Sequence, residues 1–217
     1  MTLKTPLLFL MTAATLFLSG CGTDGLLTSK EPQQTIYALR PGAPAPAAPS
    51  DIPAQIIEIA HPSLPPGMDR DRIALYLDGG RKIDYFAAAR WSSTLDDVVQ
   101  EFTRRTASSV LPYVIAVTPE ENIDPHYRLQ VKILDFQPVY DGDASGTPMI
   151  EAIVEFTLIS LPTDTVITSF MIGKRGRATD NRLDVITAGL EKMLQEIEHE
   201  AFVRIDGRLR PQDNSGR

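Results

Sequence analysis

The fold follows from the stretch YRLQVKI, residues 127–133, in which apolar and polar side chains alternate. A period of two places the apolar side chains on one face of a strand, so we expect a half-buried β-strand that continues to Phe136. The alternation returns at residues 152–158, and a turn at residues 162–164 leads to a further apolar stretch, Val166–Ile172. These segments and their short connections predict an antiparallel meander.

A first amphipathic helix is predicted ahead of the meander. It opens at Ser93 or Thr94 and has Asp96 and Asp97 in its first turn, where caps and acidic side chains favour a helix. Its apolar positions follow the i, i+3, i+4, i+7 spacing of a buried helix face. They are Leu95, Val98, Val99, Phe102 and, further on, Val110. Pro112 ends this helix.

A second helix follows the meander, begins near Asp180 or Asn181 and ends before Gly207. Its apolar stripe consists of Leu183, Ile186, Leu190, Met193, Leu194 and Ile197. Shorter apolar segments predict further strands at residues 35–39, 55–60, 73–77, 83–85 and 113–117, the last of them central in the sheet. Together these elements predict one α+β domain over residues 52–207, with a mostly antiparallel or mixed sheet covered by two helices.

The N-terminal segment has the layout of a secretory signal peptide over residues 1–20. Lys4 precedes an apolar run from Pro6 to Leu18, which is shorter than the roughly 20 residues that span a bilayer. The segment ends Leu-Ser-Gly-Cys, and Cys21 is the only cysteine of the chain. This ending resembles the lipobox of bacterial lipoproteins, in which the cysteine receives a diacylglycerol thioether and is acylated on its amine. The alternative is an ordinary cleaved signal with a buried cysteine.

The resemblance to a lipobox implies a membrane anchor at Cys21, because several acyl chains hold a protein stably at a bilayer. Gly22 follows the cysteine, and by the sorting pattern of many Gram-negative bacteria it allows export to the outer membrane, facing the periplasm. Retention in the inner membrane is the other possibility. Residues 21–51 are predicted to be a tether with a Pro/Ala-rich stretch, and residues 208–217 a disordered tail.

Composition narrows the functional classes. The formal net charge of −7 makes the chain a poor partner for nucleic acid or for anionic headgroups. The three histidines, His61, His126 and His199, lie in different predicted elements and do not form a zinc motif. No nucleotide-binding or nucleophile motif is present. We therefore expect no cofactor, no metal and no enzymatic activity.

Two short segments are weak candidates for contact with a partner. Lys174, Arg175 and Arg177 form the one basic cluster, although such a run is also typical of a solvated strand end. Arg90 and Trp91 lie at the entry to the first helix, where the tryptophan either is exposed to a partner or packs in the core.

From Tyr37 to the last helix, the chain resembles the auxiliary lipoproteins of ABC-type transport systems that work with mammalian-cell-entry (MCE) proteins, the family of paraquat-inducible protein C. The resemblance rests on the order of several loose motifs. They are Cys21, Tyr37 with Leu39, the Pro-rich loop 64–70, the strand 73–76, Tyr85 with Arg90-Trp91, Leu95 with Val99-Gln100, and 127–136 with Tyr140.

This resemblance implies a non-catalytic subunit of a lipid transport system. Its expected partners are an MCE-domain protein and, through it, an inner-membrane ABC permease and ATPase. The expected role is to dock or anchor the transport conduit at the outer membrane, as a homo-oligomer. The alternative is an envelope lipoprotein that binds the cell wall or assists another envelope machine.

Overall fold

The computed structural model describes residues 34–42, 53–68 and 70–210. Cys21, the signal peptide and residues 22–33 and 43–51 of the predicted tether therefore lie outside the described residues, as do residues 211–217 of the expected tail. In the described part, no helix has both the length and the apolar content needed to cross a bilayer.

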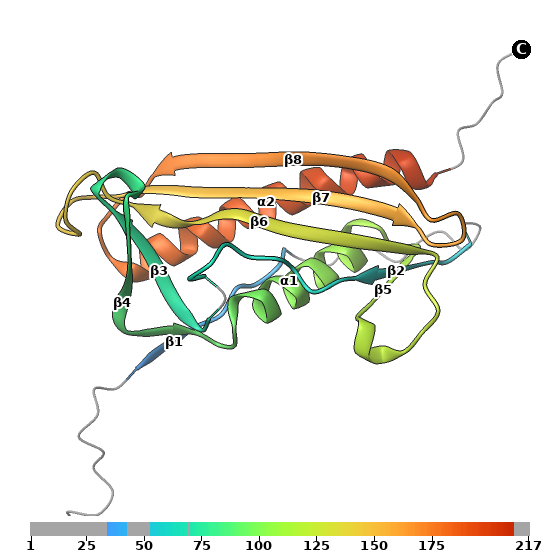
Figure 1. The fold of residues 1–217 in the computed structure, drawn as a ribbon, viewed down its shortest axis with the longest axis horizontal. Helices are drawn as coiled ribbons and strands as arrows, with labels where there is room; N and C mark the ends of the chain where they lie inside the picture. Colours follow the sequence, from blue (N-terminus) through green and yellow to red (C-terminus); the bar gives the residue numbers. More distant parts are fainter. Residues whose placement is uncertain (1–33, 43–52, 69, 211–217) are drawn as a thin grey trace, which may run out of the picture. The chain divides into compact units, whose positions relative to one another are not determined.

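The eight described strands form one mixed sheet (Figure 1). Their bounds are β1 Thr35–Tyr37, β2 Gln55–Ile59, β3 Arg72–Leu77, β4 Lys82–Trp91, β5 Val114–Val117, β6 Tyr127–Val139, β7 Met149–Ser160 and β8 Thr165–Arg177. Strands β6, β7 and β8 are antiparallel neighbours, which confirms the predicted meander. The remaining order is β1-β4-β3-β6-β2-β5, and β2 and β3 both lie parallel to β6. The predicted α+β class is confirmed.

Two helices, α1 Leu95–Val110 and α2 Leu183–Leu209, pack against each other and against the sheet. Helix α2 contacts β6, β7 and β8, whereas α1 contacts β2 and β5. Every second side chain of β7 is completely buried. These residues are Ala152, Val154, Phe156 and Leu158. The alternating apolar side chains of the strands therefore lie on one face of the sheet, where they form an apolar core with the helices.

Strand β5 is an edge strand, so the predicted central position of residues 113–117 was wrong. Among the described strands it pairs only with β2, and Ile115 is 50% exposed. The apolar character of β5 arises because Val114, Ala116 and Val117 are buried and the strand contacts α1. An edge strand that is covered by a helix therefore has the same apolar sequence pattern as a central strand.

Helix α2 continues two residues past Gly207, which was predicted to lie beyond its end. A Cβ at Gly207 would meet no atom within 4 Å, so this glycine lies on an open side of the helix. Leu209 packs against the core, and Asp206 accepts a hydrogen bond from the Tyr113 hydroxyl at 2.6 Å. These contacts hold the last turn, because tertiary packing outweighs the weak helix propensity of one glycine.

Candidate functional site

The described chain enters the sheet at β1, which begins fourteen residues after Cys21. Strand β1 lies parallel to the end of β4, with Ile36 opposite Arg90 and Tyr37 opposite Trp91. This pairing places the start of the folded domain before residue 52, the predicted boundary. The segment nearest to the expected anchor is therefore part of the sheet.

Of the two neighbours Arg90 and Trp91, the arginine lies at the surface and the tryptophan lies in the core. Trp91 is only 2% exposed, and its ring centroid lies 6.1 Å from that of Phe136. Arg90 is exposed, with its Nη1 3.6 Å from Asp71 Oδ2. The structure thus supports the core-packing alternative for Trp91 and leaves Arg90 available at the surface.

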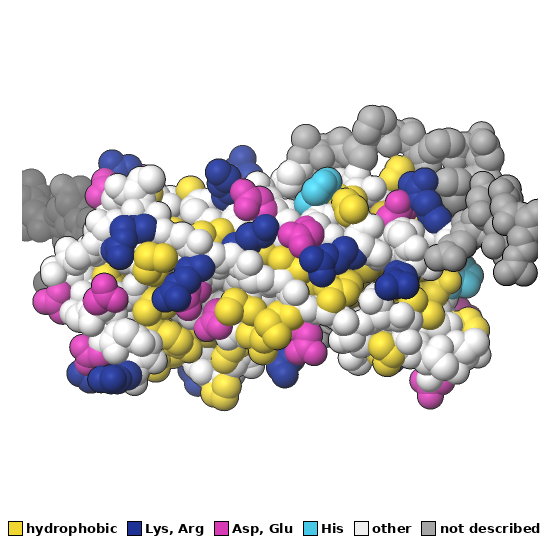
Figure 2. Space-filling view, turned by 90° about the horizontal axis from the view of Figure 1, so that it is seen from above, with side chains coloured by type: hydrophobic (Ala, Val, Ile, Leu, Met, Phe, Trp, Pro, Cys, Tyr) yellow, Lys and Arg dark blue, Asp and Glu magenta, His cyan; other side chains and the backbone are white. Residues whose placement is uncertain are grey.

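The predicted basic cluster does not form one patch, because successive residues of a strand point to opposite faces. Lys174 Nζ lies 3.3 Å from Glu200 Oε2 on α2, whereas Arg175 Nη2 lies 2.7 Å from Glu151 Oε1 on β7. Arg177 donates to the backbone oxygen of Thr147 at 2.9 Å. On the face seen in Figure 2, Lys and Arg side chains are scattered among acidic and apolar ones. Strands β3, β6 and β7 separate this cluster from Arg90.

Residues 38–42, which we call the strap, continue from β1 and are tied to α2. The Arg40 amide donates to Glu191 Oε2 at 2.8 Å, and Gln195 Nε2 donates to the Arg40 carbonyl at 2.7 Å. Leu39 packs against the core beside them. Sequence reasoning assigned these residues to the tether, since contacts between a Pro/Gly-rich segment and a helix about 150 positions away leave no local pattern.

Hollows lie on both sides of Arg40. One, of about 460 Å³, is lined by Leu39, Val98 and Phe102 among others, and another, of about 500 Å³, by Arg40, Arg104, Arg105 and Ser108. Arg104 and Arg105 both bind the Glu101 carboxylate, at 2.8 and 2.6 Å. The pKa of Glu101 lies below its usual range, chiefly because Arg104 donates a hydrogen bond to its carboxylate.

A buried carboxyl group joins the two helices. Glu198 of α2 is completely buried, and its Oε1 accepts a hydrogen bond from Thr103 of α1 at 2.6 Å. Burial raises the pKa of Glu198 to about 8. The other oxygen, Oε2, is buried without a hydrogen-bond partner among the described residues. Sequence reasoning missed this residue, although Glu198 stands four positions after Leu194 and four before Phe202, on the buried face.

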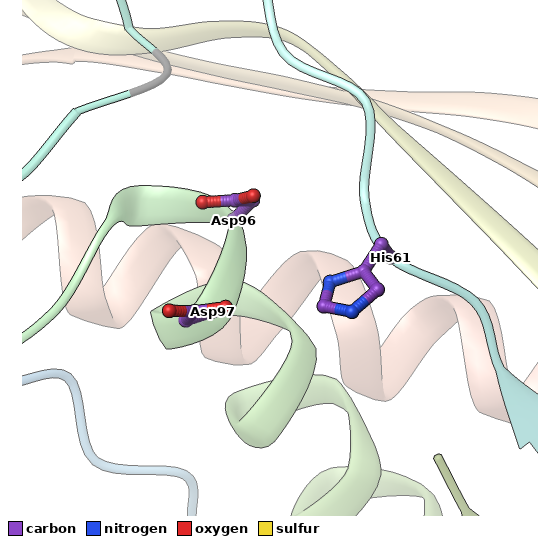
Figure 3. Close-up of side chains that lie close together, drawn as sticks. All are labelled: His61, Asp96 and Asp97. Carbon is purple, nitrogen blue, oxygen red and sulfur yellow. The ribbon is translucent and has the colours of Figure 1, made fainter. Parts of the chain in front are cut away.

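His61, Asp96 and Asp97 form a cluster (Figure 3), in which one ligand-capable atom from each lies within 4.8 Å of the others, with His61 and Asp97 exposed and Asp96 half-buried. His61 follows β2, and the aspartates lie in the first turn of α1. His61 Nε2 lies 3.0 Å from Glu120 Oε1, and Asp97 Oδ2 accepts a hydrogen bond from Ser93. An exposed ion pair and the ordinary preference for acids at a helix start account for these contacts. We assign the cluster no metal-binding role.

The fold is shared with solved structures of distant sequence. A crystal structure of a protein from Xanthomonas campestris matches 80% of this chain and 96% of its own, with a TM-score of 0.66 and 18% identity. The crystal structure of an uncharacterised protein matches 80% of this chain and 99% of its own, with a TM-score of 0.63 and 13% identity. No curated protein matches the chain. At these identities the likeness concerns the fold alone.

A family model decides the class of protein. The model for the ABC-type transport auxiliary lipoprotein component matches residues 37–198, from the last residue of β1 to Glu198 in α2. The chain therefore belongs to the family of ABC-type transport auxiliary lipoproteins, which confirms the resemblance seen in its motifs. Membership in a lipoprotein family places the protein in the cell envelope, anchored to a membrane.

Proposed function

We propose that this protein is a non-catalytic accessory subunit of an MCE-type lipid transport system, lipid-anchored at Cys21 and facing the periplasm from the outer membrane. The observation that carries the proposal is the family match, which covers the strap, strands β2 to β8, α1 and the first part of α2. In this role the domain docks or anchors an MCE-domain conduit, and through it an inner-membrane ABC permease and ATPase, as a homo-oligomer.

The course of the chain supports a docking role. β1 follows the predicted tether and pairs with β4, and the strap then binds α2 through the backbone of Arg40. Pull on the anchor would thus be borne by strand pairing and by the helix layer. Glu198, the carboxyl group whose pKa burial raises to about 8, is enclosed between the two helices and contributes to their packing.

In-cell photo-crosslinking tests the proposal. A photoreactive amino acid is placed in the full chain at one exposed position at a time, Arg90, Ser108 or Arg175, which lie on β4, α1 and β8. Gln137, which is completely buried, is the matched control position. We expect an MCE-domain protein as the main adduct from at least one exposed position and none from Gln137. Adducts with cell-wall fragments alone would contradict the proposal and favour the alternative envelope role.

A further inference from the structure

The charge of the chain is distributed unequally, and the part of the domain nearest to the expected anchor is basic. Residues 34–42 and 69–91, which comprise β1, the strap, β3 and β4, carry six basic side chains and four acidic ones. The chain as a whole carries 21 basic and 28 acidic side chains. The net charge of −7 therefore conceals a positive part, to which the expectation of poor binding to anionic headgroups does not apply.

Ion pairs within this part do not use all of its basic side chains. Asp78 Oδ2 lies 2.7 Å from Lys82 Nζ, and Asp71 Oδ2 lies 3.6 Å from Arg90 Nη1. Arg81 is exposed and has no carboxylate oxygen within 4.0 Å among the described residues. Positive charge therefore remains at the surface after the internal pairs have formed.

Five side chains of β1, β3 and β4 lie on one face of the sheet. Ile36 is directly opposite Arg90, and Arg90 is opposite Arg72. Tyr85 and Ile83 stand opposite the next two residues of β3 that have the same orientation as Arg72. We call these five residues the β1–β4 face. They are Ile36, Arg72, Ile83, Tyr85 and Arg90.

The β1–β4 face combines exposed apolar and basic side chains. Ile36 is 56% exposed and Ile83 is 42% exposed. The Arg72 guanidinium carbon lies 3.9 Å from the centroid of the half-buried Tyr85 ring. Apolar side chains beside arginine and tyrosine are typical of surfaces in the interfacial region of a bilayer, where the apolar groups insert and the cations meet phosphates.

We propose that the β1–β4 face lies against the anionic phospholipid headgroups of the membrane that holds the Cys21 anchor. This proposal rests on the lipid anchor of the proposed function and adds the orientation of the domain. Gln34 stands thirteen positions after Cys21, so even a fully extended chain keeps β1 within about 45 Å of the lipidated residue. Within this range the effective concentration of headgroups is high, and a weak contact is sufficient.

Other exposed apolar side chains lie among uncharged or acidic neighbours. Ile115 is on β5, at the end of the strand order opposite to β1, and the nearby Ile123 lies in an acidic loop, residues 120–124 (Figure 1). Val166 and Met171 are on β8, whose first nine residues carry no charge. Charge therefore distinguishes the β1–β4 face as the surface that is complementary to anionic headgroups.

Fluorescence quenching in vesicles tests this orientation with the full, lipidated chain. Ile83→Cys carries an environment-sensitive dye, and the vesicles contain a headgroup-spin-labelled phospholipid in phosphatidylethanolamine, with or without phosphatidylglycerol. Ile115→Cys is the matched control, because the two isoleucines have similar exposure on strands at different ends of the sheet. The wild type should take up no dye, since a thioether blocks Cys21.

With phosphatidylglycerol present, we expect at least about threefold stronger quenching at Ile83→Cys than at Ile115→Cys, and less of it at high salt. Adding Arg72→Gln and Arg81→Gln to the labelled Ile83→Cys chain should reduce its quenching to about half or less. Arg208→Gln, which replaces an exposed arginine near the end of α2, should leave the quenching unchanged.

Equal quenching at the two positions, or quenching that does not depend on phosphatidylglycerol, would overturn this orientation and leave the anchor in place. A chain that does not float with the vesicles, or dye on Cys21 of the wild type, would overturn the anchor and with it both proposals. In cells, a photoreactive amino acid at Ile83 that yields an MCE-domain protein or a second copy as its main adduct would overturn the orientation alone. The orientation predicts MCE adducts from Ser108 or Arg175 instead.

Discussion

The β6–β8 meander and the strap both contact α2, but through different chemistry. The meander contributes completely buried apolar side chains such as Val154 and Phe156. The strap contributes two hydrogen bonds at Arg40 and one partly buried leucine. Burial of apolar area makes the meander inseparable from global stability, whereas a segment held by a few exposed polar contacts opens on its own. The difference separates the core of the domain from a segment whose contacts can open locally.

The largest expected effect comes from truncating the meander core. Phe156 is completely buried and lies 5.8 Å from the Phe170 ring, measured between centroids. Phe156→Ala should lower the free energy of unfolding by about 3–5 kcal/mol, because the lost side chain leaves a cavity. Urea unfolding measures the change. Thr157→Ala, the next residue on the opposite face, is the control, and similar losses from both variants would contradict this assignment of the core.

The buried carboxyl group gives the next effect and a pH dependence. The pKa of Glu198 is about 8 in the folded state, against an ordinary value of 4.5, so folding takes up a proton between these values. The contribution of Glu198 to the free energy of unfolding is fully present below pH 4.5 and is lost as the pH rises through 8.

Glu198→Gln should remove this slope and stabilise the protein by on the order of 1–3 kcal/mol at pH 8. Urea unfolding at several pH values measures the effect. The control is Glu196→Gln, an exposed position two residues earlier. An unchanged slope in Glu198→Gln would show that this carboxyl group does not govern the helix interface.

Loosening the strap should have a smaller and more local effect. Gln195→Ala removes the hydrogen bond to the Arg40 carbonyl and should cost about 0.5–1.5 kcal/mol. In this variant, hydrogen exchange of the Thr35–Tyr37 amides should become faster, whereas exchange of the meander amides should stay as in the wild type. Gln130→Ala, at an exposed position of β6, serves as the reference. Uniformly faster exchange throughout the domain would show that the strap belongs to the same cooperative unit as the meander.

The smallest effect is expected at the surface of the meander. The Arg175 side chain is 65% exposed in its ion pair with Glu151, whose side chain is 18% exposed, and an ion pair with its cation in water contributes little. Arg175→Ala should lower the free energy of unfolding by about 0.2–1 kcal/mol, less so at high salt. Thermal unfolding at two salt concentrations measures it. A loss as large as that of Phe156→Ala would mean that the two faces of the meander are equally important.

The two regions also differ in what their sequences predict. Alternation from Tyr127 to Ile133 follows from burial on one face, so the meander and its helices were predictable from local periodicity. β5 was misplaced in the sheet because a strand buried under α1 has the same apolar composition as a central strand. The strap was not predictable, since its bonds join Arg40 to Glu191 and Gln195, far away in sequence. Glu198 was detectable, because its helical spacing places it among buried apolar residues.

Co-purification from native membranes tests the proposed docking role. The full lipoprotein, tagged at its C-terminus, is extracted in mild detergent, and the proteins recovered with it are quantified by mass spectrometry against an untagged control. We expect an MCE-domain protein to be the most enriched partner. Recovery of the tagged protein without any MCE-domain protein, but with cell-wall material, would contradict the proposed docking role and leave only the membership in the lipoprotein family.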